Sequence, residues 1–300
     1  MGAAHPGPTG RRGVEPSTPL RLARIEHATF PGTVTPWPKE DRRYVTDLVR
    51  SFDRPDPPPH SFAGGRTTFR DMVDELSRRL GPAASFDLAV LAHCTPDAEP
   101  GWPAYRLLDL TDSAGTAFAV SDQGPTVAFT GLRLATGAGA GPGPRRAHVW
   151  ALDQRRTLHG EAVPARVRAT TDAAAVLVLE PDGPLEIATA GHLAGVRRED
   201  VGDVLRAAAD AADTGGPPVT AVWGIGVPPE ARGTAAVASE CCAEAGRPVT
   251  GVWSALSALW TPARPGSGPY LVSDYDEDLG YLGYCVLRPV RSAASASDGP

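Results

Sequence analysis

Residues Ala117–Ala135 read AFAVSDQGPTVAFTGLRLA and combine the pattern of a strand with that of a following helix. The stretch begins inside an apolar run, Gly115–Ser121 (GTAFAVS), which is typical of a short buried strand. Asp122 is a residue type that favours the N-cap of a helix, and Pro125 suits a first helical turn. We therefore predict a strand, a tight turn, and then a buried helix from about Pro125 to the end of the stretch.

Strand-like and helix-like segments alternate on both sides of this stretch. One helix before it is indicated by apolar residues at helical spacing, namely Phe69, Met72, Val73, Leu76 and Leu80. The other expected strands are Phe86–Ala92, His148–Leu152, Ala174–Glu180, Leu185–Ala190, Val219–Gly224, Pro248–Val252, Tyr270–Ser273 and Leu282–Leu287. The other expected helices are Glu199–Ala212, Pro229–Ala245 and Ser254–Trp260. Apolar strands that alternate with helices predict an α/β fold with helices on both faces of a sheet.

The two halves of the chain have similar content, so we expect an internally duplicated architecture. The expected N-terminal half covers residues 21–183, and the C-terminal half covers residues 184–290. Residues 1–20 and 291–300 are rich in Pro, Gly and small polar residues. Such segments bury too little apolar surface to offset their ordering entropy, so we expect disordered tails at both ends.

The amino-acid composition limits the kinds of partner that the protein is expected to bind. The chain has 29 basic and 35 acidic residues, a net charge of −6, which argues against binding to nucleic acid. No apolar stretch approaches the roughly 18 residues of a membrane span. The four cysteines form no CxxC pair, and the first residues lack the apolar core of a secretory signal. We expect a cytoplasmic protein with no metal, and the abundance of Gly, Pro, Ala and Arg suggests a high-GC genome such as an actinobacterium's.

Four segments, in order, resemble the thiolase superfamily, and most closely its β-ketoacyl-acyl-carrier-protein synthase III-like branch. The segments are Phe86–Asp97, Ala117–Ala135, Thr170–Gly183, and Gly251–Trp260 together with Tyr270–Pro289. The second resembles the family's strand, nucleophile elbow and central helix, and the last resembles its final glycine-rich strand pair. The resemblance covers residues 21–290. It implies a thiolase-like duplicated fold of α/β/α/β/α layers, in which each half contributes a mixed five-stranded sheet.

Catalysis in that family depends on three side chains. A cysteine at the start of the central helix takes the acyl group as a thiolate, and the helix N-terminus lowers its pKa and stabilises the oxyanion. A histidine and an asparagine in the second half promote decarboxylation of a malonyl group and hold the enolate oxygen. The family's chemistry is expected of this chain only if it has the matching residues at these three positions.

The nucleophile position falls in the turn SDQG at residues 121–124. A left-anchored alignment puts Gly124 there, and a slip of one residue puts Gln123 there. No cysteine lies between Cys94 and Cys241. Some ketosynthase relatives carry glutamine at this position and act as decarboxylases or as chain-length partners, but decarboxylation still needs the histidine.

The histidine and asparagine positions are also replaced. The histidine position falls near Gly224, and the last histidine of the chain is His192. The asparagine position falls at Val252, and no asparagine lies nearby. The resemblance therefore implies a retained scaffold without the Cys-His-Asn set.

The residues near these positions could have either a structural role or a role in a catalytic or binding pocket. Ser121 would need a base within hydrogen-bond reach to act as a nucleophile, whereas the Asp122 carboxylate suits a helix cap. His93 and Cys94 are adjacent on an expected strand, so their side chains should point to opposite faces. We therefore expect Cys94 to be a buried structural thiol, and we keep both residues as pocket candidates.

Aromatic and acidic residues of the second half are further pocket candidates. Trp223 and Trp253 lie near the replaced positions and would fill the volume of the former acyl pocket. Asp274, Asp276 and Asp278 resemble part of an EF-hand loop, but the glycine at the sixth position and the distal glutamate are missing. An acidic turn or a partner contact is favoured over a metal site, and we expect no cofactor.

Two functions linked to the resemblance remain open at this point, and a plain binding module unrelated to acyl groups is a third alternative. The first is a catalytically silent protein of fatty-acid or polyketide-type specialised metabolism, which pairs with an active ketosynthase or binds an acyl carrier protein or acyl-CoA. The resemblance implies a homodimer or heterodimer joined through the strand at Phe118–Ser121. The alternative is a divergent acyltransferase that forms an ester or amide from an acyl thioester with non-standard residues.

Overall fold

The computed structural model describes residues 18–32, 35–101, 103–109, 115–137, 143–158, 163–213, 215–235, 237–263, 266 and 268–290. The elements of the first half are β1 (Arg21–Thr29), α1 (Lys39–Ser51), η1 (Pro59–Phe62), α2 (Phe69–Leu80), η2 (Gly81–Ala84), β2 (Leu88–His93), α3 (Pro103–Asp109), β3 (Thr116–Val120), η3 (Gly124–Thr126), α4 (Val127–Thr136), β4 (Ala147–Asp153), η4 (Ala165–Val167) and β5 (Ala173–Glu180). Those of the second half are β6 (Leu185–Leu193), η5 (Arg198–Asp200), α5 (Val201–Ala212), β7 (Thr220–Trp223), α6 (Pro229–Arg232), β8 (Ser239–Cys242), α7 (Gly251–Leu259), β9 (Tyr270–Asp276) and β10 (Tyr281–Pro289). The expected tails lie outside the described residues, apart from residues 18–20.

The strand order repeats between the two halves. The sheet reads β3-β2-β4-β5-β1-β6-β10-β9-β7-β8. Numbered from one within its own half, each set of five strands has the order 3-2-4-5-1. The two sets meet at a short antiparallel contact between β1 and β6, in which Arg21 pairs with Glu186 and Leu22 with Leu185. The expected duplicated α/β fold with mixed five-stranded halves is confirmed.

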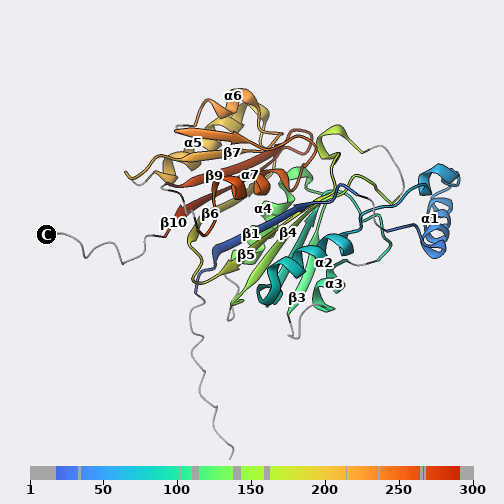
Figure 1. Ribbon diagram of the computed structural model, residues 1–300. Helices are drawn as coiled ribbons and strands as arrows, with labels where there is room; N and C mark the ends of the chain where they lie inside the picture. Colours follow the sequence, from blue (N-terminus) through green and yellow to red (C-terminus); the bar gives the residue numbers. More distant parts are fainter. Residues whose placement is uncertain are drawn as a thin grey trace, which may run out of the picture.

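Apart from α1, which stands away from the sheet, the α-helices lie in three layers (Figure 1). The helices α2 and α3 pack on the outer face of the first half, and α5 and α6 pack on the outer face of the second. The helices α4 and α7 lie between the halves, because α4 contacts β2, β4, β6 and β10, and α7 contacts β1, β7 and β9. Together with the strands of the two halves, this gives the α/β/α/β/α arrangement.

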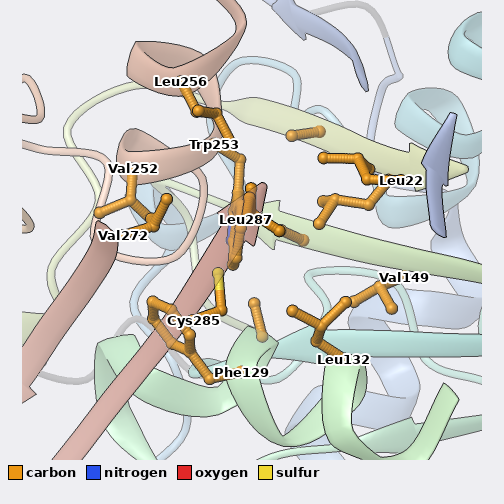
Figure 2. Close-up of a cluster of buried hydrophobic side chains, with 14 of the residues drawn as sticks. Leu22, Phe129, Leu132, Val149, Val252, Trp253, Leu256, Val272, Cys285 and Leu287 are labelled. Atoms are coloured by element: carbon orange, nitrogen blue, oxygen red, sulfur yellow. The ribbon is translucent and has the colours of Figure 1, made fainter. Parts of the chain in front are cut away.

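The central layer is packed with large side chains (Figure 2). Trp253 of α7 and Phe129 of α4 are fully buried, with ring centroids 5.1 Å apart. Leu22 and Val149 of the first half and Cys285 of the second belong to the same cluster. Burial of a large apolar side chain contributes about 2–3 kcal/mol, so this layer joins the two halves into one core.

Most expected elements are present. The helix α2 buries the apolar face predicted for it, and a capping box between Thr68 and Asp71 begins it. The closing pair β9 and β10 is an antiparallel ladder, as expected. We did not predict β1, α1 or α3. No described helix has both the length and the apolar character needed to cross a membrane.

Three local predictions were wrong. The helix expected at Pro229–Ala245 ends at Arg232, and Cys241 and Cys242 lie on strand β8 instead. Gly233 follows the short helix, and pairing with β7 completes the fifth strand of the half, so tertiary context overrides the alanine-rich helix propensity. The strand expected at Pro248–Val252 is a turn leading into α7, because the Asp153 carboxylate accepts the backbone N–H groups there.

The third error concerns Asp122, which we expected to cap the central helix. Asp122 instead has a left-handed backbone with φ +63°, and its carboxylate accepts a hydrogen bond from the Ser121 hydroxyl. The residue that precedes α4 is Thr126, after the short η3 segment. The chain reverses direction within a few residues here, and such a reversal uses left-handed positions.

Candidate functional site

The turn between β3 and α4, which we call the elbow (residues 121–126), is the centre of the candidate site. It contains two left-handed residues, Asp122 and Gly124. Gly124 and Thr126 are buried, whereas Asp122 is exposed. The elbow therefore presents a glycine, without a side chain, at the start of the central helical segment.

Asp276, the last residue of β9, fills the space in front of Gly124. A Cβ atom added to Gly124 would overlap the Oδ2 atom of Asp276. Asp276 has a fully buried side chain, and its Oδ1 accepts the backbone N–H of Leu279 at 3.0 Å. The Asp276 carboxylate, which comes from strand β9, thus occupies the space into which a side chain of residue 124 would project.

Asp274 fills the corresponding space next to Gly224. A Cβ atom on Gly224 would overlap the carboxyl group of Asp274. The Oδ1 atom of Asp274 accepts the backbone N–H groups of Tyr275 at 2.8 Å and Gly226 at 3.0 Å. Burial raises the pKa of Asp274 to about 7, and the nearby Asp276 carboxylate contributes to the increase.

A third buried carboxylate, Asp153, ends β4 and caps α7. It accepts the backbone N–H groups of Val249 and Thr250 and the Thr250 hydroxyl at 2.7–3.2 Å. Burial raises its pKa to about 6. Because β4 and β9 are the fourth strands of their halves, Asp153 and Asp276 occupy equivalent ends of the duplicated fold. One faces the start of α7, and the other faces the elbow before α4.

Arg166 is the cation next to these acidic groups. Its Nε donates to the Oδ2 atom of Asp276 at 2.9 Å, and its Nη1 donates to Asp278. Asp276 and Asp278 are therefore both paired with one guanidinium. This pairing argues against the metal-loop interpretation of the acidic turn, since a cation ligand set needs free carboxylates.

The polar groups of the elbow make a separate network on its other side. Thr126 donates its hydroxyl proton to the Gln123 carbonyl at 2.7 Å. Its oxygen also lies 2.9 Å from Nε2 of His192, so the imidazole donates this bond from Nε2. The Gln123 side chain accepts a bond from the Thr130 hydroxyl. Gln123 is thus held by α4.

Of the other predicted pocket residues, His93 and Trp223 lie apart from the elbow carboxylates. Burial raises the pKa of Cys94, and this residue lies close enough to Asp153 and Asp276 for their charges to add to the increase. His93 points to the outer face, where its ring lies 5.2 Å from Phe69 of α2, while Cys94 packs against the central cluster. Trp223 packs on the outer face of the second half and donates its indole N–H to Glu240. Trp253 lies in the central layer. The structure places Asp274 next to Gly224 and Asp276 next to Gly124, and it leaves His93 and Trp223 outside.

Sequence reasoning missed Asp153, Arg166 and His192 as parts of the site. A signal existed for Asp153, because it ends the apolar run HVWALD at the carboxyl end of a predicted strand. Arg166 lies in a short segment with no apolar pattern, and nothing in the sequence connects it to Asp276, 110 residues away. Only the fold brings these two groups together.

Comparison with solved structures gives the class of fold, which is that of the thiolase-like condensing enzymes. The acyltransferase ChlB3 matches with a TM-score of 0.60 and 17% identity, over 92% of this chain and 99% of that chain. The priming β-ketosynthase of the R1128 polyketide pathway matches with a TM-score of 0.59 and 17% identity, over 94% and 99%. The 3-oxoacyl-[acyl-carrier-protein] synthase III of Aquifex aeolicus matches with a TM-score of 0.54 and 12% identity, over 90% and 99%.

The sequence itself has no close counterpart in the other two comparisons. No protein-family model matches the chain, and no curated protein matches it either. The similarity to the condensing enzymes is therefore one of fold over nearly the whole chain, at low sequence identity.

Proposed function

We propose that this chain is a condensing-enzyme relative without acyl-transfer chemistry, which acts as a non-catalytic subunit in fatty-acid or polyketide-type metabolism. The observation that carries the proposal is the position of two carboxyl groups. Asp276 and Asp274 occupy the space into which side chains at positions 124 and 224 would project. These two positions are where the resemblance puts the nucleophile and the histidine.

The groups that fill the site are poor substitutes for the family's catalytic set. The Asp276 carboxylate is buried and paired with Arg166, which lowers its reactivity as a nucleophile. Asp274 is held by two backbone N–H groups, and among the described residues no imidazole forms a hydrogen bond with it. The third position is Val252, a buried aliphatic residue, and the sequence contains no asparagine. A thiolate and a decarboxylating pair are thus both missing.

The interior next to the elbow also supports the proposal. Phe129 and Trp253 fill the central layer, and a Cβ on Gly283 of β10 would overlap the Phe129 ring (Figure 2). An acyl chain needs an apolar cavity of its own length. Close packing of these rings leaves the central layer as core.

A condensation assay tests the proposal. Purified protein is mixed with an acyl thioester and a malonyl thioester, on CoA and on a carrier protein, and both product and CO2 release are measured. We expect no turnover above the rate without protein. A rate that exceeds this background, and that is lost in a variant of residues 123, 274 or 276, would contradict the proposal.

The edge strand β3 is the surface we assign to a partner of the same fold, either a second copy of this chain or an active condensing enzyme. It ends the sheet, and Thr116 and Ala119 are exposed. Thr116 donates its N–H to Asp87 inside the sheet, so the alternate N–H groups of Ala117 and Ala119 point outward. A free strand edge with an outward row of donors is suited to pairing with another strand.

Replacing Ala119 by proline should break this pairing. Proline removes one outward N–H group and leaves the bonds to β2 intact, which proline tolerates on edge strands. We expect wild-type protein to be a dimer in light scattering and Ala119→Pro to be a monomer with an unchanged circular dichroism spectrum. The matched control, Ala119→Ser, should stay dimeric. A dimer that persists in the proline variant would contradict the assignment of β3. If the wild-type chain is monomeric, the assignment of β3 is tested instead by co-purification with an active synthase.

The divergent acyltransferase is the second candidate, because Ser121 and Asp122 form an exposed hydroxyl–carboxylate pair at 2.9 Å. The hydroxyl donates to the carboxylate, which is the first requirement for activating it. His93 lies in the neighbouring strand, but its Nδ1 contacts the Thr95 carbonyl at 2.9 Å, and burial lowers its pKa. Acyl transfer lost in Ser121→Ala but kept in Gln123→Ala would support this candidate over the first.

A further inference from the structure

Residues 163–169, which include η4, form a segment across the elbow that we call the strap. The short helices η3 and η4 are in contact, so the strap lies directly against the start of the central helix. Val167 and Ala169 are buried, whereas Pro164, Ala165 and Arg168 are exposed. The strap therefore has one face on the protein and one face in solvent.

The strap makes its hydrogen bonds mostly within itself. The N–H of Val167 donates to the Pro164 carbonyl, and that of Arg168 donates to the Ala165 carbonyl. The Arg168 guanidinium donates to the Val163 carbonyl. Within the described part of the chain, the first backbone bond to another element follows the strap, from Thr170 to Gly246.

Arg166 is the side chain that ties the exposed middle of the strap to the second half. It pairs with Asp276 at the end of β9 and with Asp278 in the β9–β10 turn. The guanidinium is about one-third exposed, and the Asp276 side chain is fully buried. A buried carboxylate is destabilised when its partner leaves. The pairing of Arg166 with Asp276 is therefore strongly favoured over an arrangement in which the guanidinium has moved away.

A pocket lies on the solvent side of Arg166. It has a volume of about 510 Å³, and its wall includes Arg166, Gly226 and Asp278. Behind that wall, the N–H of Gly226 donates to Asp274, and Arg166 donates to Asp276. Arg166 thus lies between this pocket and the buried carboxylates of the elbow.

Cys94 lies beneath the strap. Its thiol donates to the Val167 carbonyl at 3.6 Å, and burial raises its pKa well above the usual range. Any movement that lifts Val167 from the protein would therefore uncover the thiol. Cys94 is half-buried, whereas Cys285 of β10 is buried and remote from the strap, and Cys242 of β8 is exposed.

We propose that the strap is a lid on the elbow and that Arg166 is the latch that holds it closed. Withdrawal of the guanidinium from Asp276 and Asp278 frees the strap, and the outer pocket then continues inward to the carboxylates. The device does not depend on acyl chemistry. An experiment can therefore contradict the proposed function without contradicting the lid, and the reverse also holds.

Thiol labelling of the full chain tests the lid. The protein is exposed to a maleimide, and the modification rate of each cysteine is read by peptide mass mapping. In wild-type protein we expect fast labelling of Cys242 and slow labelling of Cys94 and Cys285. Arg166→Ala should accelerate Cys94 by at least about tenfold, since labelling of a covered thiol follows the open population, and should leave Cys285 unchanged.

Matched variants separate the latch from general loosening. Arg168→Ala removes the neighbouring arginine, which bonds only within the strap, and should not change the Cys94 rate. Arg166→Lys keeps the charge without the two-pronged geometry, so its Cys94 rate should lie between wild type and Arg166→Ala. An unchanged Cys94 rate in Arg166→Ala would overturn the proposal. Equal acceleration of Cys94 and Cys285 would also overturn it, because it would report global opening.

Discussion

Replacement of Gly124 by alanine should lower the free energy of unfolding by about 3–5 kcal/mol. Two effects add at this position. The backbone of Gly124 is left-handed, with φ +56°, which costs an alanine about 1–2 kcal/mol. The new methyl group would also overlap Asp276, so the carboxylate has to move away from Arg166. Urea denaturation followed by circular dichroism measures the loss.

Two control variants separate these effects. Gly195 has φ +71° and no atom within 4 Å of an added Cβ, so Gly195→Ala should show the backbone effect alone, about 1 kcal/mol. In the double variant Gly124→Ala with Asp276→Ala, the overlap is removed. The double variant should then lose less stability than the two single variants together. Strict additivity, or a Gly124→Ala loss no larger than that of Gly195→Ala, would show that Asp276 does not fill this space.

The second large effect is a pH dependence that belongs to Asp274. Burial raises its pKa from 3.8 to about 7. A group whose pKa is higher in the folded state binds its proton more tightly there, so its favourable contribution is complete below pH 3.8. That contribution is lost as the pH rises towards 7. The total change is about 4 kcal/mol, at 1.36 kcal/mol for each pKa unit.

Asp274→Asn should remove this dependence. Asparagine keeps an oxygen to accept the N–H groups of Tyr275 and Gly226 but does not ionise. Between pH 5 and pH 8, wild-type protein should lose roughly 2–3 kcal/mol more stability than the variant. Asp97 and Asp153, whose pKa values are also raised to about 6, are present in both proteins and cancel in the comparison. Parallel stability curves for the two proteins would contradict the buried, protonated state of Asp274.

The periodicity of apolar residues and the turn residues that bound each segment were sufficient to predict much of the fold. The apolar runs at β2, β5 and β9 are long and bounded by turn residues, and α2 combines a regular apolar face with a glycine-proline stop. The prediction at β8 failed because this strand lies within an alanine-rich stretch, residues 229–245, which favours a helix. Only its place beside β7 makes it a strand. Strand β1 has a mixed charged and apolar pattern, which hides its position next to β5.

The sequence predicted little of how the candidate site is built. It shows directly only that no cysteine lies between Cys94 and Cys241 and that no histidine follows His192. That Asp274 and Asp276 point inward follows from alternation along β9, once the buried face is known. Their overlap with the spaces of Gly224 and Gly124 depends on how the two halves pack, and no local pattern records it.

If the proposed function is correct, no group at the elbow accepts an acyl chain. Intact-mass spectrometry of the purified protein after exposure to acyl-CoA and to an acyl carrier thioester measures this. An unchanged mass is expected. A stoichiometric acyl adduct mapped to residues 121–126, Asp274 or Asp276, and discharged by a malonyl thioester, would contradict it.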